Sequence, residues 1–303
     1  MDQLISAILI GLSQGAIYSL MALALVLVFR STRVINFAQA GQAVVSTYIG
    51  WEVVTRTGNY WLALPIAAIA GAIVGAAVES FLMRPLSKRA SKGAIAPVAS
   101  VILTLGLLGV LHSGAAIIWK GDQKLLESPV SAMGITVGET VYPFSQTDFL
   151  IIGTALLVML TFSFIFQKTN LGLALRASAF QPEIARLSGV RVDRIRAIGW
   201  AFAGAAGAIA GVLVTPGSAL SPNSLDLLLV FGFVAAVIGG LESLIGAALG
   251  GILLGLTLSF VGLSFVGLYI GTSLTFVVPF VILILVLLIK PSGLIGGRKS
   301  RNA

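Results

Sequence analysis

The feature that most constrains this chain is a series of apolar stretches, each about as long as a helix that crosses the hydrocarbon core of a bilayer. Only 10% of the 303 residues are charged and the mean hydropathy is +1.04, which excludes a soluble globular protein. The pattern predicts an all-α, polytopic integral membrane protein, a single transmembrane domain over residues 1–303 with about nine spans, roughly eight to ten. The expected spans are residues 4–28, 36–54, 61–82, 94–118, 149–166, 197–215, 225–241, 244–262 and 271–289.

The inventory of reactive side chains excludes several kinds of chemistry. The chain has no cysteine, and so it can form neither a disulfide nor a thiolate metal site or nucleophile. It contains no G-x-x-x-x-G-K-[ST] phosphate-binding motif, no nucleophile with a partnered base and no cluster of metal ligands. We therefore predict no catalytic residue, no metal site and no cofactor in this chain.

The basic residues are divided unevenly between the two sides of the predicted bundle. If residues 167–196 lie inside, only Arg56, Lys120 and Lys124 of the 19 Lys and Arg residues lie outside. This bias places the N-terminus outside, the C-terminus in the cytoplasm, and the polar residues 119–148 in an external loop. The basic residues form short clusters beside apolar spans, so we predict no nucleic acid partner. The other interior segments are residues 29–35, 83–93, 242–243 and the C-terminal tail.

Residues 167–196 are a polar segment between two apolar spans, with six basic and two acidic side chains. Residues 181–189 predict a short helix, because Pro182 stands at its first position, Glu183 in its first turn and Gly189 just past its end. Such a helix is either a solvated connector whose charges only set orientation, or a rigid peg that docks a partner. The pattern alone leaves both alternatives open.

Three amides recur at helical spacing in an otherwise apolar segment. Asn36, Gln39 and Gln42 share one face of a predicted helix, and that face should point into the bundle. They could line a transport path together with irregular backbone, or they could form hydrogen bonds between helices worth about 1 kcal/mol each. The residues favour neither alternative over the other.

Four further ionisable residues lie within or near the predicted spans. Glu79 precedes Arg84 by five residues, and we expect a structural ion pair that anchors the end of the third span. Glu242 lies near the end of a span, where its carboxylate can extend to the membrane surface. His112 is the only histidine, and we expect a neutral imidazole bonded to a carbonyl rather than a functional group.

Five groups of residues form motifs in order along most of the chain. They are Gly11-Leu12 with Gly15-Ala16-Ile17-Tyr18; Val34-Ile35-Asn36-Phe37-Ala38-Gln39; Glu79 with Arg84-Pro85-Leu86; Thr169-Asn170-Leu171-Gly172 with Leu175-Arg176-Ala177, Glu183, Ala185 and Leu187-Ser188-Gly189-Val190; and Ile238-Gly239-Gly240-Leu241 with Ser243, Gly246 and Ala247. These motifs resemble the permeases of branched-chain amino acid ABC importers. The segment Ala40-Gly41-Gln42 departs from that family's usual Gly followed by an acidic residue, and Glu242 replaces a usual small residue, which leaves the substrate open.

The resemblance implies a role for two sets of residues. A coupling segment that meets the ATPases would contain Arg176, Pro182, Glu183, Ala185, Arg186, Leu187 and Gly189. A substrate pathway would be lined by Asn36, Phe37, Gln39, Gly41, Gly239 and Gly240. The resemblance also implies two inverted repeats, formed by the first four and the last four spans.

Partners and location follow from the same resemblance. It implies a second related permease in a heterodimer, two cytoplasmic ATPase subunits that carry ATP and Mg²⁺, and an external substrate-binding protein. The chain would lie in a bacterial cytoplasmic (inner) membrane and carry branched-chain or other neutral amino acids inward. Urea or a short amide is the alternative solute within the family. An ion-coupled secondary transporter is the alternative from another class, which the scarcity of acidic residues within the spans disfavours.

Overall fold

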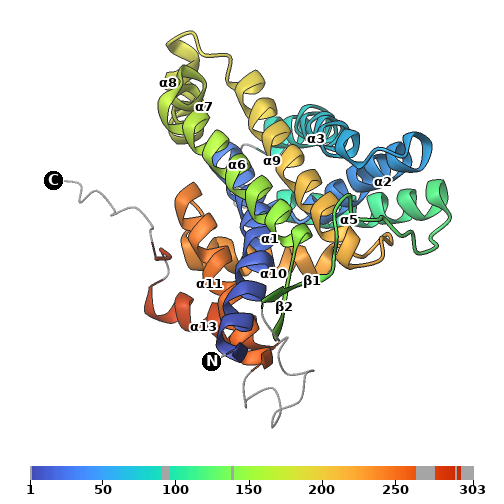
Figure 1. Ribbon diagram of the computed structural model, residues 1–303. Coiled ribbons are helices and arrows are strands. Elements are labelled where there is room, and N and C mark those ends of the chain that lie inside the picture. The colour runs from blue at the N-terminus through green and yellow to red at the C-terminus, as the bar shows by residue number, and fades with distance from the viewer. Residues whose placement is uncertain (1, 91–95, 138–139, 264–276, 291, 295–303) are drawn as a thin grey trace.

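The computed structural model describes residues 2–90, 96–137, 140–263, 277–290 and 292–294. Its α-helices are α1 (Asp2–Thr32), α2 (Gln39–Thr57), α3 (Tyr60–Ala77), α4 (Arg84–Ala90), α5 (Ala96–Trp119), α6 (Gln146–Lys168), α7 (Asn170–Phe180), α8 (Pro182–Leu187), α9 (Val192–Val214), α10 (Asp226–Gly239), α11 (Leu244–Leu263) and α13 (Val278–Ile289). A π-helix, η1 (Val78–Met83), joins α3 to α4, and a 3-10 turn, η2 (Thr215–Gly217), follows α9. The predicted all-α class is confirmed (Figure 1).

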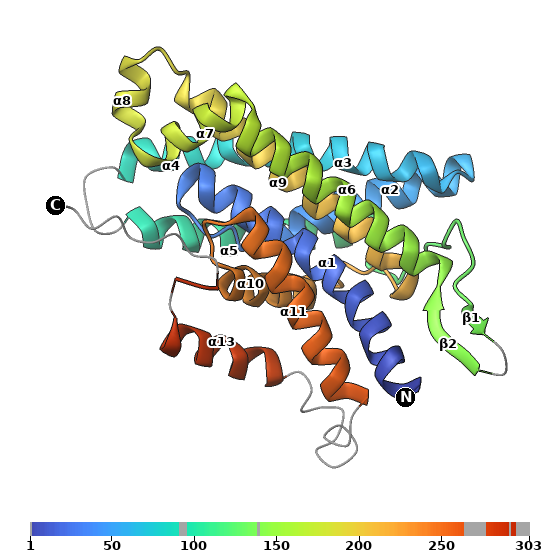
Figure 2. The same ribbon diagram turned by 60° about the vertical axis from the view of Figure 1, so that its left-hand side comes forward.

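The predicted external loop contains a small antiparallel hairpin that the sequence analysis does not anticipate. Strand β1 (Gly134–Val137) pairs with β2 (Thr140–Ser145), and Ile135 lies opposite Tyr142. Val141 is 64% exposed, whereas Phe144 is buried, so the hairpin has one face against the bundle and one face open. Figure 2 shows the hairpin at the end of the bundle where α1 begins, far from α8.

Helix α1 lies in the middle of the bundle (Figure 2). Its residues from Leu20 to Val28 are all buried, so the helix is covered on every side, as expected for an apolar helix within a larger protein. It contacts α11 closely, because any side chain at Gly15 would meet the Cα of Ile252 at 2.8 Å. The hydroxyl of Ser19 donates to the carbonyl of Ala248 on α11 at 2.7 Å. Small residues therefore set the spacing of these two helices.

Six helices in the described part of the chain are long and apolar enough to cross a membrane. They are Gln3–Thr32, Tyr60–Arg89, Val98–Trp119, Gln146–Lys168, Val192–Gly217 and Leu244–Gly262. The predicted count of nine therefore depends on whether α2, α10 and α13 cross the membrane as well. Helix α2 is not among the six, and α10 and α13 are the two shorter apolar helices of the described part. Residues 271–276 of the last predicted span lie outside the described residues.

The predicted interior segment at residues 83–93 is helical over most of its length, and not a loop between spans. The backbone of α3 continues through η1 into α4, and the amide of Arg84 donates to the carbonyl of Glu79 in the wider π-helical turn. Arg and Lys favour helices, and their long side chains can reach water from the end of a span, so a basic cluster does not require a loop. Residues 91–93, including Lys92, lie outside the described residues.

Candidate functional site

Helix α8 is the short helix that the sequence predicts, and its bounds confirm that prediction. It begins at Pro182, and its first turn carries Glu183. After it, Gly189 adopts a φ of 84°, its amide donates to Arg186 at 3.0 Å, and the amide of Val190 donates to Ala185 at 2.9 Å. These two bonds form a Schellman motif, which fixes how α8 ends.

The two sides of α8 differ sharply in exposure. Ala185 is buried, whereas Ile184 is 56% exposed and Leu187 is 89% exposed. Phe180, at the end of the preceding helix α7, is 77% exposed. These large apolar side chains lie at the tip of the bundle opposite the N-terminus, so the tip carries an apolar surface next to charged residues (Figure 2). We name Phe180, Ile184 and Leu187 the tip surface.

Asp193, at the start of α9, joins the tip to the rest of the bundle. Its carboxylate contacts Arg186 of α8 at 3.1 Å and Lys88 of α4 at 3.9 Å, and its carbonyl accepts from Arg84 at 3.0 Å. Arg186 also contacts Glu183 at 3.7 Å within α8. Two segments far apart in sequence are thus held by one residue, which the sequence analysis did not single out.

Glu79 is buried in η1, near the same cluster. Arg196 and Arg84 are the cations that act on its carboxylate, with Asp193 as a nearby like charge. Arg84 uses its Nη2 atom to reach the carbonyl of Asp193. The direct ion pair between Glu79 and Arg84 stays a prediction, and Arg196 is a cationic neighbour that spacing along the chain did not suggest.

The three amides before and within α2 are all buried, but they differ in their contacts. Asn36 donates to the side-chain oxygen of Gln39 at 3.0 Å, and Gln39 donates to the carbonyl of Ala203 on α9 at 3.0 Å. The bond from Gln39 to Ala203 joins two helices, as the structural alternative expects, whereas the bond from Asn36 is local. Gln42 differs, because both polar atoms of its side chain are buried without a hydrogen-bond partner in the described residues. Gln42 is therefore the amide of the three whose hydrogen-bonding groups are unused in the described residues.

The other predicted pathway residues contact different helices. Phe37 packs on Phe233 of α10, with ring centroids 6.2 Å apart, so the start of α2 does meet the second half of the chain. Gly41 instead faces α5, where an added Cβ would lie 2.9 Å from Leu111. Gly239 packs against the backbone at the start of α11, and Gly240 ends α10 with a φ of 100°. The structure therefore brings Phe37 to α10 but directs Gly41 toward another helix.

His112 has a partner that the sequence analysis overlooked. Its Nε2 atom lies 3.2 Å from Oδ1 of Asp226, at the start of α10, in an orientation that forms no hydrogen bond. The expected bond from a neutral imidazole to a carbonyl is therefore replaced by contact with a carboxylate. Asp226 was missed because it lies near the start of a predicted span, and nothing in the local sequence indicates that it faces a histidine on another helix.

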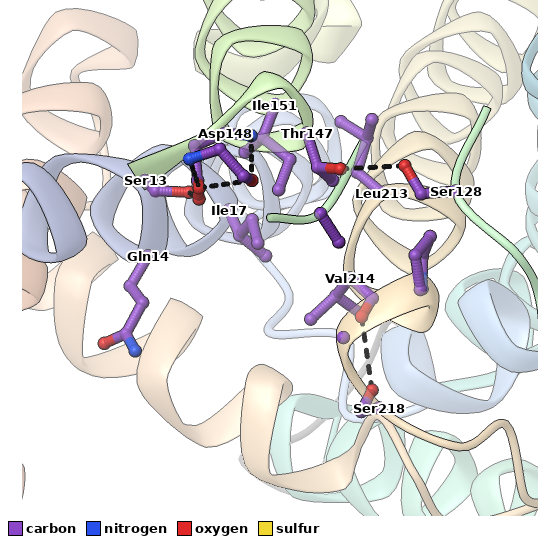
Figure 3. Close-up of a pocket in the computed structure, with 14 residues that line it drawn as sticks. Ser13, Gln14, Ile17, Ser128, Thr147, Asp148, Ile151, Leu213, Val214 and Ser218 are labelled. Atoms are coloured by element: carbon purple, nitrogen blue, oxygen red, sulfur yellow. Dashed lines mark hydrogen bonds between the residues drawn. The ribbon is translucent and has the colours of Figure 1, made fainter. Parts of the chain in front are cut away.

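A cavity of 270 Å³ lies at the end of the bundle that carries the hairpin (Figure 3). Asp148 accepts from the hydroxyl of Ser13 at 2.5 Å and from the amide and hydroxyl of Ser145 at 2.7 Å, so both of its oxygens are satisfied. Gln14 lines the cavity but points away from this cluster. The remaining lining includes Ile17, together with other apolar, hydroxyl and backbone groups. Such a lining suits a small, neutral and partly apolar solute.

The cavity at the hairpin end gave only a weak signal in the sequence. Ser145 and Asp148 form a capping box at the start of α6, and that spacing could have been recognised as a helix start. The approach of α1 and α9 to that helix start is a long-range contact and leaves no local pattern. In the described part of the chain, no three His, Asp or Glu side chains gather in a group that could hold a metal ion.

The comparisons with known proteins agree on one family. The family model for the permease component of branched-chain amino acid transport systems matches residues 7–287. The chain is 30% identical to the probable branched-chain amino acid transport permease protein LivH of Methanocaldococcus jannaschii, over 91% of this chain and 88% of the relative. It is 29% identical to the high-affinity branched-chain amino acid transport system permease protein LivH of Escherichia coli K12, over 94% of this chain and 93% of the relative.

The name of a further relative specifies a different solute. The chain is 32% identical to the putative glucose ABC transporter permease protein TsgC13 of Haloferax volcanii, over 58% of this chain and 53% of the relative. No solved structure matches the chain at a significant level.

Proposed function

Because this chain belongs to the family of permease components of branched-chain amino acid transport systems, we propose that it moves branched-chain or other neutral amino acids into the cell as the permease subunit of an ATP-binding-cassette importer. Its long apolar helices and its family make it a multi-pass membrane protein and a transport subunit. The single observation that carries the proposal is α8, a short helix with a fixed end and an exposed apolar surface at one tip of the bundle.

The coupling role is assigned to α8 and its flanks. The tip surface offers apolar contacts to an ATPase, while Arg186 and Asp193 tie any movement of α8 to α9. Gly189 and Ala185 hold the geometry through the Schellman motif. The proposed coupling residues are Arg176, Pro182, Glu183, Ala185, Arg186, Leu187 and Gly189.

The energy would come from partner subunits. Two ATPase subunits, which hold ATP and Mg²⁺, would dock on the tip surface and close when ATP binds. A second related permease would complete the membrane part, and an external binding protein would deliver the solute at the hairpin end. In this arrangement α8 and the C-terminus face the cytoplasm, the N-terminus faces outward, and the chain lies in the cytoplasmic (inner) membrane.

The pathway would run past the start of α2 toward the cavity at the hairpin end, which is lined by Ser13, Ile17 and Asp148. Its proposed residues are Asn36, Phe37, Gln39, Gly41, Gly239 and Gly240. To these the geometry adds Gln42, whose buried amide has no partner in the described residues. An importer fed by a binding protein does not need a tight site in the membrane, because tight binding would slow release. A few amides among small and apolar side chains meet that requirement.

The relatives that cover nine-tenths of the chain or more support an amino acid as the solute, since their printed names specify branched-chain amino acids. A glucose permease matches a shorter part, so the shared segment does not by itself fix the solute. The departure at Ala40-Gly41-Gln42 keeps urea or a short amide as the alternative, because Gln42 could bind an amide group.

Reconstitution tests this proposal. The full chain, copurified with the subunits that bind it, is placed in proteoliposomes with ATP inside, and binding protein loaded with leucine, urea or glucose is added outside. We expect leucine-loaded binding protein to raise ATP turnover and to drive leucine inward, with urea and glucose without effect. Turnover that responds to urea alone would replace the amino acid with the alternative solute. Turnover that responds to no solute, from an intact complex, would contradict the importer proposal.

The contact of His112 with Asp226 favours a second candidate, an ion-coupled transporter, because ionisable pairs within a membrane domain can carry protons. Uptake by the permease alone, without ATPase subunits, would follow a pH gradient in that case. We expect no such uptake. Uptake that persists without ATPases and that His112→Gln abolishes would establish the second candidate instead.

A further inference from the structure

A second cavity lies at the α8 end of the bundle, and its lining is unusually rich in arginine. It has a volume of 270 Å³ and is lined by Arg30, Arg33, Arg176, Ala179, Phe180 and Glu242. Three segments that are distant in sequence meet there: the end of α1, the middle of α7 and the turn between α10 and α11. The proposed function does not use this convergence.

The charges of this cavity do not balance. Glu242 is the only acid in the lining, and it forms an ion pair with Arg33. In the described part of the chain, no carboxylate lies within 4.0 Å of the guanidinium of Arg30 or Arg176. Arg30 is half-buried, stacks over Phe166 at 5.9 Å from the ring centroid, and is close enough to Arg176, Glu242 and Arg33 to be affected by their charges. The lining thus holds three arginines and one carboxylate, and an anion would balance the excess positive charge.

The chemistry of the lining favours a phosphate group. All the cations in the lining are arginines, and the planar guanidinium binds two phosphate oxygens at once, which the ammonium of lysine cannot do. The cavity lies at the ends of α1 and α11, two of the long apolar helices, and the end of a membrane-spanning helix lies near lipid headgroups. Phe180, which is 77% exposed and belongs to the tip surface, also lines the cavity.

We propose that the cavity between Arg30, Arg33 and Arg176 binds a phosphate group, carried by an anionic phospholipid at the membrane surface. Such a ligand would link α7 to α1 and to the turn before α11. The position of Arg176 gives it a second role beside its place in the proposed coupling segment. Glu242 then limits the positive charge of an empty cavity by pairing with Arg33.

Direct binding tests the proposal without relying on transport. The full-length permease, purified in detergent, is titrated with short-chain phosphatidylglycerol, short-chain phosphatidylcholine or inorganic phosphate, and bound ligand is measured by native mass spectrometry. We expect saturable binding of phosphatidylglycerol and little binding of phosphatidylcholine. Saturation by phosphatidylglycerol but not by phosphate identifies the lipid as the source. Saturation by phosphate alone keeps the phosphate site and replaces the lipid with a soluble ligand.

Matched variants locate the site. The double variant Arg30→Gln/Arg176→Gln should weaken phosphatidylglycerol binding about 30-fold, since each basic residue contributes a factor of about five near a lipid surface. Lys168→Gln/Arg194→Gln removes the same charge from exposed positions at the same end and should leave binding unchanged. Glu242→Gln should strengthen binding about fivefold, which a general loss of fold would not do.

Two outcomes would overturn the proposal. One is equal binding of phosphatidylglycerol by wild type and by the Arg30→Gln/Arg176→Gln variant, with both folded. The other is lipid binding that none of these variants changes, together with loss of copurified ATPase from the same double variant, which would assign the cavity to an acidic side chain of a partner protein. If the double variant fails to fold, Arg176→Gln alone, at an exposed position, should still weaken binding about fivefold.

Discussion

Two of the polar segments that interrupt this apolar chain differ in where they lie in the structure. The segment around α8 projects from the end of the bundle and exposes its large apolar side chains, with Leu187 at 89% exposure. The segment at the start of α2 lies inside the bundle and buries Asn36, Gln39 and Gln42. Both look like breaks in the same hydrophobic pattern. A polar segment in an apolar chain can therefore be recognised from the sequence. Whether its side chains face solvent or the inside of the bundle is known only from their burial.

The largest expected effect concerns which side of the membrane each segment faces, because a thiol on the far side should not be labelled at all. Ser188→Cys and Ser131→Cys place single thiols in a chain that has no native cysteine, at exposed positions beside α8 and in the segment before β1. An impermeant thiol reagent applied to intact cells should label position 131 and spare position 188. Labelling after the cells are opened serves as the control that both thiols can react. The reverse pattern would overturn the assignment of α8 to the cytoplasm.

The next largest effect is expected at the end of α8. Gly189→Val forces a β-branched residue to a φ of 84°, which costs on the order of 1–3 kcal/mol and disrupts the Schellman motif. ATP-driven uptake in proteoliposomes should fall by about tenfold or more at normal expression. Gly189→Asn should retain most uptake, because asparagine tolerates this conformation.

Gly58→Val is the matched control for that change. Gly58 ends α2 with a φ of 67° and has open space around it, as Gly189 does. The same strain at this helix end should spare uptake. Equal loss of uptake in the Gly58 and Gly189 variants would show that the loss comes from general instability and not from a role of α8 in coupling.

A smaller effect is expected from the tip surface. Leu187→Ala removes an exposed apolar side chain that would be covered by a docked ATPase, and full burial of a leucine contributes about 1.5–3 kcal/mol. The amount of ATPase that copurifies with the permease should fall about tenfold at subsaturating concentration. Ile117→Ala, at an equally exposed position on α5, should not change it. Unchanged association in the Leu187 variant would remove this residue from the docking surface.

The smallest effect separates the two amides of α2. Gln39→Leu leaves Asn36 and the carbonyl of Ala203 without their partner, and thermal unfolding should show a loss of about 1–3 kcal/mol. Gln42→Leu removes an amide with no partner in the described residues, so stability should be unchanged or higher, while uptake falls. Equal destabilisation by both substitutions would show that Gln42 makes a structural bond as well.

The sequence predicts the parts of this molecule that depend on local chemistry. Helix α8 follows from Pro182 and Gly189, since both act on the backbone at their own positions. The all-α class follows from the length of the apolar stretches. Helix α7 was missed because its polar residues suggested a loop, although Thr169 caps it by accepting from the amide of Gly172. Its capping pattern was present in the sequence but not used.

The remaining features depend on contacts between distant residues. His112 meets Asp226 across 114 positions of chain, and Arg33 meets Glu242 across 209, so no spacing rule links them. The amides of α2 show the same limit. Their spacing predicts a shared face, but only the neighbouring helix α9 decides that Gln39 is bonded and Gln42 is not.

The contact between α3 and α9 has a mechanical consequence. Gly71 and Gly204 touch through their backbones, as do Gly75 and Trp200, so no flexible side chain separates the two helices at these points. The two helices therefore cannot approach each other any further at these points, and a side chain larger than hydrogen at either pair would force them apart. If α8 has the proposed coupling role, a displacement of α8 would reach α9 through the contact between Arg186 and Asp193, and α3 would have to move with α9. The proposed coupling would then reach α3 as well, a helix that has no place in the proposed coupling segment.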